Sequence, residues 1–266
     1  MNTERLKNKK LFLLDMDGTI YLEEHLFDGT LDLLRYIRSV GGRYIFLTNN
    51  SSRGTEGYIE KLKRIGIDAA AEDFVTSADA TAMYLKEHFP PGTGFYVCGT
   101  QSLKDMFRQE GLRVAEEDRN ADALILGYDT ELTYEKLCAS VRLINRGVPY
   151  IATHPDLVCP VSYGSAPDCG SVINMLETCT GKRPLVIGKP QPEMVYLAMK
   201  KTGFSPEETC VTGDRLYTDI ACGVNAGIDS VFVLSGEGVT EDIEKYGIRP
   251  TWVLKNVREL VSILTG

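Results

Sequence analysis

The sequence predicts an α/β protein in which helices cover both faces of a doubly wound parallel sheet. Short apolar runs alternate with amphipathic stretches at both ends of the chain, and such alternation is typical of βαβ units. The 266 residues are 43% hydrophobic and 25% charged, a balance typical of a globular protein rather than a disordered or fibrous one. The length fits either one large domain or two ordinary ones.

The alternation begins near the N-terminus. Residues 11–14 and 44–47 are short apolar runs that predict buried strands, and residues 31–40 and 58–65 have the spacing of amphipathic helices. Near the C-terminus the same alternation predicts strands at 185–187, 210–212 and 230–233 and helices at 193–201 and 219–226. We expect the strands of both ends to form one sheet.

The middle of the chain has an alternation of its own. It predicts strands and helices at 94–98, 102–109, 123–126, 132–145 and 150–153, then a Pro- and Gly-bearing stretch at 155–170 and a last helix at 171–180. The chain contains no long linker and no repeat of fixed period. A domain boundary therefore has to be argued from the residues that carry chemistry.

Charge and cysteine content narrow the class of partner. The formal net charge of −8 would repel nucleic acid and an anionic membrane surface, so we expect neither as a partner. No apolar run approaches the ~20 residues that a bilayer requires, and the N-terminus lacks a signal-peptide core. The seven cysteines form no C-x-x-C pair, which favours a reducing compartment and a cytoplasmic protein.

Two carboxylates follow the first predicted strand directly. Asp15 and Asp17 stand in the run Asp-Met-Asp-Gly-Thr. In a doubly wound sheet the carboxyl ends of the strands are where ligands bind, and the sheet itself offers these side chains no partner. The alternative is a solvated turn in which the aspartates bond to their own backbone.

Three further polar segments also follow predicted strands. Thr48 and Asn49 begin a run of hydroxyl and amide side chains, Lys189 follows the next strand, and Asp214 and Asp219 follow the one after it. Alone, each has a plain structural alternative, such as a helix cap or a solvated surface lysine. Four such strand ends in one sheet favour a common site.

Carboxylates, one lysine and neutral donors at one crevice predict phosphoryl transfer. Carboxylates that lie close together raise one another's pKa unless a hard cation neutralises them. Oxygen ligands without nearby His or Cys select Mg²⁺. A magnesium ion, a lysine and neutral donors facing a common point are what the equatorial oxygens of a transferring phosphoryl group require.

At this point the motifs resemble those of phosphatases of the haloacid dehalogenase (HAD) superfamily. The runs Asp-Met-Asp-Gly-Thr-Ile-Tyr, Leu-Thr-Asn-Asn-Ser, Ile-Ala-Thr-His-Pro-Asp and Ile-Gly-Lys-Pro look like the NagD-like or 4-nitrophenylphosphatase branch. The likeness covers nearly the whole chain. It implies a HAD-like catalytic core at residues 1–78 and 185–266, with a large α/β cap for substrate specificity inserted at 79–184.

The resemblance also implies roles for the core residues. Asp15 is the expected nucleophile, which would form an aspartyl-phosphate, and Asp17 is the expected general acid and base. The implied Mg²⁺ ligands are Asp15, the backbone carbonyl of Asp17 and Asp214, with Asp219 orienting them. Thr48 and Lys189 would contact the phosphoryl group, and Asn49 would shape the substrate edge of the site.

Substrate choice is expected to come from the cap. Asp168, Cys169 and Gly170 align with the substrate loop of the family. Asp168 could accept hydrogen bonds from sugar hydroxyls or simply cap the following helix. His154 stands where relatives usually carry Asn, and it is either a structural histidine or a proton donor. Cys169 has no His or Lys beside it in the sequence, so we expect a small pocket residue rather than a second nucleophile.

These observations predict a Mg²⁺-dependent phosphatase for small phosphorylated metabolites, with sugar phosphates and 4-nitrophenyl phosphate as the best substrates. A phosphotransferase or mutase that uses the same intermediate stays open, as does a phosphatase for a nucleotide, phosphoglycolate or pyridoxal phosphate. Oligomeric state is not readable from the sequence, and a homodimer through the cap stays open. We expect hinges sensitive to proteases at residues 77–79 and 183–185.

Overall fold

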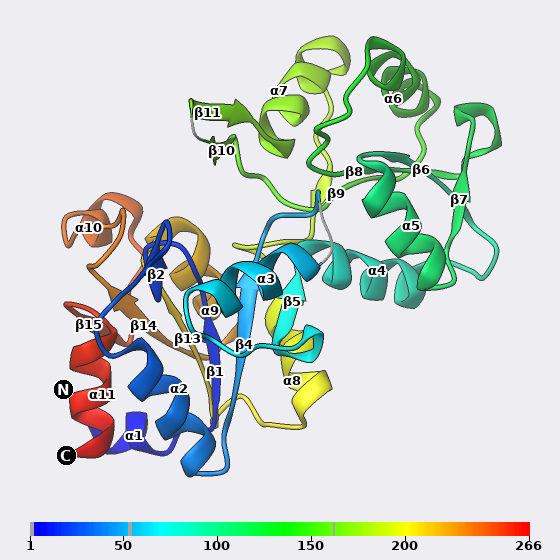
Figure 1. Cartoon of the computed structure of the whole chain (residues 1–266). Helices are drawn as coiled ribbons and strands as arrows, with labels where there is room; N and C mark the ends of the chain where they lie inside the picture. The colour runs from blue at the N-terminus through cyan, green and yellow to red at the C-terminus, as the bar shows by residue number, and fades with distance from the viewer. Residues whose placement is uncertain (1–2, 53–54, 162) are drawn as a thin grey trace. The chain divides into compact units, whose positions relative to one another are not determined.

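The computed structural model describes residues 3–52, 55–161 and 163–266. The chain divides into two compact units. The first unit comprises Met1–Thr48, Thr55–Val75 and Lys189–Gly266, and the second comprises Asn49–Gly54 and Thr76–Gly188. Figure 1 shows both, coloured along the chain.

The first unit is built on a six-stranded sheet. Its strand order is β15-β14-β13-β1-β4-β5, with bounds Trp252–Leu254, Asp229–Val233, Thr209–Gly213, Leu11–Leu14, Arg43–Thr48 and Phe74–Thr76. Strand β1 pairs in parallel with both β4 and β13, and β14 pairs in parallel with β13 and β15. The predicted parallel sheet is therefore confirmed.

Helices and short segments complete the first unit. In chain order they are α1 (Thr3–Lys7), β2 (Tyr21–Leu22), β3 (His25–Leu26), α2 (Thr30–Ser39), α3 (Glu56–Arg64), α8 (Glu193–Thr202), a π-helical turn (Leu216–Ile220), α9 (Ala221–Ala226), α10 (Asp242–Tyr246) and α11 (Val257–Thr265). Strands β2 and β3 pair as a two-stranded antiparallel hairpin. Helices α1 and α2 both pack against α11.

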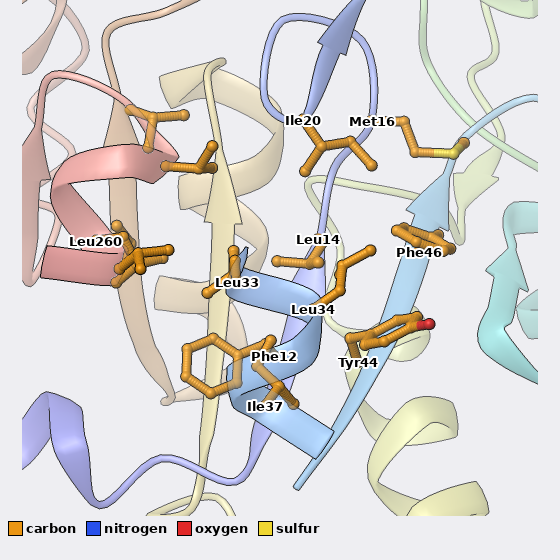
Figure 2. Close-up of a cluster of buried hydrophobic side chains, with 14 of the residues drawn as sticks. Phe12, Leu14, Met16, Ile20, Leu33, Leu34, Ile37, Tyr44, Phe46 and Leu260 are labelled. Atoms are coloured by element: carbon orange, nitrogen blue, oxygen red, sulfur yellow. The ribbon is translucent and has the colours of Figure 1, made fainter. Parts of the chain in front are cut away.

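One apolar cluster joins the first sheet to its helices. Leu33, Leu34 and Ile37 of α2 are buried, and their spacing places them on one face of the helix. They meet Leu14 and Phe46 of the central strands, as Figure 2 shows. Because such side chains are fully enclosed, truncating one to Ala would cost roughly 2–5 kcal/mol. This core fixes the strand ends from which the polar side chains project.

The second unit has its own parallel sheet of five strands. Its order is β12-β9-β8-β6-β7, with bounds Leu185–Val186, Tyr150–Ala152, Ala123–Leu126, Gly94–Cys98 and Arg113–Ala115. Strand β9 pairs in parallel with β12 and β8, and β6 pairs in parallel with β8 and β7. The helices of this unit are α4 (Ser77–His88), α5 (Gln101–Gln109), α6 (Tyr134–Arg146) and α7 (Cys169–Thr180), and a separate apolar cluster fills it.

One expectation is wrong, and the structure adds detail to two others. The strand predicted at 185–187 does not join the sheet of β1, because β12 pairs with β9 in the second unit. The stretch at 155–170 contains two strands that pair antiparallel, β10 (Val158–Val161) and β11 (Gly164–Pro167). The expected hinge at 77–79 is the first turn of α4, where Thr76 and Asp79 form a reciprocal capping box.

Two further features concern the cysteines and the length of the helices. All seven cysteines are free thiols. Among the helices of the described residues, none has the length and apolar content that crossing a membrane requires.

Candidate active site

The polar cluster of the first unit starts at the end of β1. The strand is fully buried, and the Asp15 amide still bonds to the carbonyl of Thr212 at 2.9 Å, so the aspartate leaves the sheet in a fixed position. Strand β1 lies between β4 and β13. The residues that follow all three strands therefore come together at one edge.

Lys189 bridges the carboxylates at this edge. Its Nζ donates to Asp15 Oδ1 at 2.7 Å and to Asp219 Oδ1 at 2.6 Å. It also donates to the carbonyl oxygen of Leu47, near the end of β4, at 3.3 Å. The residue is 4% exposed, so its charge is held in a site with little water, where it acts strongly on both carboxylates.

Asp214 is enclosed by backbone. A Cβ added to Gly18, whose φ is +80°, would lie 2.4 Å from Asp214 Oδ2, and one added to Gly236 would lie 2.0 Å from the same atom. Glycine is therefore required at both positions for the chain to approach this closely. The Glu237 amide donates to Oδ2 at 2.8 Å, and Thr19 Oγ1 donates to Oδ1 at 3.3 Å.

Asp219 lies on the π-helical turn Leu216–Ile220 that precedes α9. Its Oδ2 accepts from the Arg215 amide at 3.1 Å while its Oδ1 accepts from Lys189. The side chain is 1% exposed. Each of its oxygens thus has a fixed donor, which holds the carboxylate toward Asp15 and Asp214.

The charges of this cluster are not balanced by protein alone. Burial, and next the nearby Asp219, raise the pKa of Asp15 to about 8, although Lys189 opposes the shift. Burial and Asp219 also raise the pKa of Asp214 to about 6. Burial lowers the pKa of Lys189, but Asp15 and Asp219 outweigh it, so its pKa stays above the ordinary value and the ammonium stays charged.

This imbalance fits a hard cation. Asp15, Asp214 and Asp219 each offer an oxygen, and the three ligand atoms lie within 4.8 Å of one another. A divalent cation among them would favour the ionised carboxylates that burial otherwise disfavours. The cluster could therefore hold a metal ion, and its all-oxygen character suits a hard one.

Asp17 and Thr48 are two further predicted residues of the first unit. The Asp17 side chain is 63% exposed, and its Oδ2 lies 3.6 Å from Lys61 Nζ. Thr48 is buried at the end of β4, and its Oγ1 lies 3.3 Å from the hydroxyl of Tyr58. Sequence reasoning missed Lys61, which α3 brings beside Asp17 and whose Nζ also lies 4.0 Å from the centre of the Tyr21 ring. No spacing signal marks it, because the contact is made between separate elements.

Asn49 and the predicted substrate loop belong to the second unit. Asn49 Nδ2 donates to Asp156 Oδ1 at 3.2 Å. Asp168 is the N-cap of α7 and accepts from the Cys169 amide at 2.6 Å, and the Gly170 amide donates to the carbonyl of Asp156 at 2.8 Å. Burial raises the pKa of the Cys169 thiol, which keeps it protonated. Asp156 is a further member that sequence reasoning did not single out.

Comparison with known proteins identifies the family. A model described as haloacid dehalogenase-like hydrolase matches residues 12–113, and one described as HAD-hydrolase-like matches residues 186–260. An acid sugar phosphatase from Staphylococcus aureus (strain NCTC 8325 / PS 47) is 34% identical over 259 residues, which cover 97% of this chain and 99% of that protein. The chain belongs to the haloacid dehalogenase-like hydrolases.

Solved structures of other family members resemble this hydrolase throughout. A 4-nitrophenylphosphatase from Thermotoga maritima is 40% identical with a TM-score of 0.91, covering 98% of this chain and 99% of that one. A glycerol phosphate phosphatase from Mycobacterium tuberculosis, solved in complex with calcium, is 30% identical with a TM-score of 0.88, covering 96% of this chain and 76% of that one. This HAD-like hydrolase is therefore a phosphoric monoester hydrolase, as the sequence predicts.

Proposed function

We propose that this phosphatase hydrolyses small phosphorylated metabolites, sugar phosphates above all, through a phosphoryl group carried on Asp15. The position of Lys189 Nζ, 2.7 Å from Asp15 and 2.6 Å from Asp219, carries this proposal. A charged lysine beside the attacking carboxylate can hold a phosphoryl oxygen there and offset its negative charge.

The first half of the reaction transfers the phosphoryl group to the enzyme. An oxygen of Asp15 bonds to phosphorus while the bond from phosphorus to the leaving oxygen breaks. Asp17 gives its proton to that leaving oxygen. Its exposed side chain lies outside the buried cluster, which suits a group that must reach a departing alcohol. Thr48 donates a hydrogen bond to a phosphoryl oxygen.

The second half releases phosphate. Asp17, now ionised, takes a proton from water, and the water oxygen bonds to phosphorus as the bond to Asp15 breaks. Lys189 then pairs again with the freed Asp15 carboxylate. The products are the alcohol and inorganic phosphate, and the enzyme returns to its starting protonation state.

Asp15, Asp214 and the backbone carbonyl of Asp17 would hold Mg²⁺, with Asp219 orienting them. When bound, this ion offsets the negative charge of the phosphoryl oxygens. The oxygen donors of the cluster support a hard cation, as does the calcium complex of the glycerol phosphate phosphatase from Mycobacterium tuberculosis.

We further propose that the loop with Asp168, Cys169 and Gly170 selects the leaving group. The similarity to an acid sugar phosphatase and to a glycerol phosphate phosphatase supports hydroxyl-rich monophosphates as substrates. The 4-nitrophenylphosphatase from Thermotoga maritima supports an unspecific aryl phosphate as a second substrate. Asn49, whose side chain is bonded to Asp156, contributes to the same edge.

The proposal is tested by locating the phosphorylated residue of the protein and by measuring the phosphate that is released. The chain is mixed with 4-nitrophenyl phosphate and Mg²⁺ and quenched in acid, and the phosphorylated peptide is located by mass spectrometry. We expect phosphate on Asp15, and phosphate on another residue would contradict the mechanism. Release of inorganic phosphate, measured with and without an alcohol acceptor, separates hydrolysis from phosphotransfer or mutase activity.

Substrate choice is tested with a panel of phosphate esters. Sugar phosphates should exceed nucleotides, phosphoglycolate and pyridoxal phosphate in kcat/KM. A marked preference for one of the last three would replace sugar phosphates as the substrate class while leaving the mechanism intact. The homodimer through the cap and the cytoplasmic location stay predictions, which the molar mass in solution and cell fractionation test.

A further inference from the structure

A second polar cluster lies entirely within the second unit. It consists of His154, Asp156 and Asp168, whose ligand atoms lie within 4.8 Å of one another. His154 and Asp156 follow β9, and Asp168 immediately precedes α7. Neither His154 nor Asp156 takes part in the transfer steps proposed above, so the cluster needs a separate explanation.

His154 is the unusual member. It is 0% exposed, and neither of its ring nitrogens has a hydrogen-bond partner among the described residues. Its Nδ1 lies 3.7 Å from Asp156 Oδ2 and its Nε2 lies 3.5 Å from Asp168 Oδ1. Both distances exceed the ~2.7–3.2 Å of an N–H···O hydrogen bond. A buried polar group without a partner costs about 1–3 kcal/mol, so a ligand that pairs with the imidazole would stabilise this arrangement.

The spacing fits a metal ion. Ligand atoms that surround one ion tetrahedrally at ~2.0–2.2 Å lie roughly 3.3–3.6 Å apart. The 3.5 Å between His154 Nε2 and Asp168 Oδ1 falls in this range. One imidazole nitrogen with two carboxylate oxygens is a donor set that suits Zn²⁺ better than Mg²⁺.

The negative charge of the two aspartates also favours a bound cation. Asp168 is 5% exposed, and burying a carboxylate is unfavourable unless a positive charge accompanies it. Over residues 3–52, 55–161 and 163–266, no lysine or arginine forms an ion pair with Asp156 or Asp168. A divalent cation would supply the missing charge.

Both carboxylates also accept a hydrogen bond from a neighbouring group. Asn49 Nδ2 donates to Asp156 Oδ1, which leaves Oδ2 on the side of His154. The Cys169 amide donates to Asp168 Oδ1 at the start of α7. Such supporting hydrogen bonds orient ligands before an ion arrives, and their loss typically weakens metal binding about 10–100-fold.

We propose that His154, Asp156 and Asp168 form a second metal site, which binds Zn²⁺, with water completing the coordination. His154 offers one ring nitrogen, and each aspartate offers one oxygen. This site lies within one unit and shares Asp168 with the proposed substrate loop, but it shares no residue with the phosphoryl-transfer steps. Its failure would therefore leave those transfer steps untouched, and failure of the transfer steps would leave this site standing.

The direct test observes the imidazole itself. The chain contains three histidines, so the ring nitrogens of the metal-free full-length protein give few ¹⁵N signals, and the His154→Asn spectrum assigns those of His154. One equivalent of Zn²⁺, added with Mg²⁺ in excess, should move a His154 ring-nitrogen signal to a position typical of a metal-bound nitrogen. Unmoved His154 signals at saturating Zn²⁺ would overturn the proposal, whatever the variants do.

Matched variants count the ions. Zinc bound per chain is measured after equilibrium dialysis of the wild type, His154→Asn, Asp168→Asn and His88→Asn. His88 is an exposed histidine of α4 in the same unit, with its ring stacked on Tyr84, and it controls for nonspecific binding to histidine. We expect His154→Asn and Asp168→Asn to bind one zinc ion fewer per chain than the wild type, and His88→Asn to bind as many as the wild type. Equal zinc content in wild type and His154→Asn would overturn the site.

An additional variant separates the two clusters. Asp214→Asn removes an oxygen ligand of the first unit and leaves the second unit unchanged. The His154 signals of Asp214→Asn should still respond to Zn²⁺ with the affinity of the wild type. A response lost in Asp214→Asn would assign the zinc effect to the first cluster and refute the second site.

Discussion

Each unit carries a cluster that includes carboxylates, yet the two clusters balance their charge differently. In the first unit the buried ammonium of Lys189 bridges Asp15 and Asp219. In the second unit His154 lies between Asp156 and Asp168, with both contacts longer than a hydrogen bond. A cluster with its own fixed cation can hold its carboxylates together while a substrate comes and goes. The second cluster has no such ammonium among the described residues, and we propose a bound metal ion in its place.

Among changes to the first cluster, removing the nucleophile should reduce kcat the most. Asp15→Asn keeps the size of the side chain but cannot form the phosphoryl intermediate, so kcat should fall by at least about 10⁴-fold. Asp17→Asn should reduce kcat by roughly 10²–10⁴-fold, because only proton transfer is lost. Steady-state assays with 4-nitrophenyl phosphate measure both losses. Substantial turnover by Asp15→Asn would place the nucleophile elsewhere.

Metal removal tests whether the lysine alone suffices. Without a divalent cation the first cluster holds three carboxylates against the single ammonium of Lys189, so we expect activity to vanish on exhaustive chelation. Mg²⁺ should restore it, and Mn²⁺ or Co²⁺ should substitute in part. Phosphate release is the readout. Full activity after chelation, with metal content verified, would contradict a metal-dependent reaction.

Acidity should weaken metal binding at the first cluster. The pKa of Asp15 is raised to about 8 and that of Asp214 to about 6, from an ordinary 3.8. Between the ordinary pKa of 3.8 and the raised values of about 6 and about 8, the folded metal-free protein binds more protons than the unfolded chain. Its free energy of unfolding therefore falls as the pH rises from about 4 to about 8. Mg²⁺ competes with those protons, so its affinity should drop by roughly tenfold per pH unit for each proton displaced.

Calorimetric titration with Mg²⁺ at pH 6, 7 and 8 measures this effect. The thermal stabilisation by Mg²⁺ should also be larger at pH 8 than at pH 6. Asp214→Asn is the matched control, since it removes one of the two titrating carboxylates and should flatten the dependence. An affinity that does not change across this range would show that neither carboxylate is protonated in the metal-free protein.

The sequence predicts the first cluster better than the second for a physical reason. Asp15, Lys189, Asp214 and Asp219 all follow or adjoin apolar runs, and parallel strands place such residues at one edge. Lys189 reaches that edge although β12 pairs with β9 in the other sheet. Local periodicity identifies a strand but not its partner, because pairing between distant segments depends on tertiary packing. The sheet to which β12 belongs could therefore not be predicted.

The second cluster shows the same limit. From the sequence, Asp168 is a candidate helix cap and His154 a candidate structural histidine, and the N-cap is confirmed for Asp168. Their proximity to each other, and the hydrogen bond from Asn49 to Asp156, are contacts between segments far apart in the chain. No spacing in the sequence encodes them. Helix α4 went unpredicted because its pattern is weakly amphipathic, with small residues such as Ala78, Ala80 and Ala82 on its buried side.

The smallest effect we predict separates the two roles of Asp168. Asp168→Ala removes both the charge and the N-cap of α7, which costs about 1 kcal/mol of stability. Asp168→Asn keeps a cap of similar strength but removes the charge. If the carboxylate accepts hydrogen bonds from sugar hydroxyls, both variants should lower kcat/KM for sugar phosphates by roughly tenfold or more. The loss on 4-nitrophenyl phosphate should be smaller, because the aryl group donates no hydrogen bond. The assays use Mg²⁺ buffers freed of zinc, so that the proposed second metal site does not contribute. Equal losses on both substrates with Ala, and wild-type kinetics with Asn, would mean that Asp168 only caps its helix.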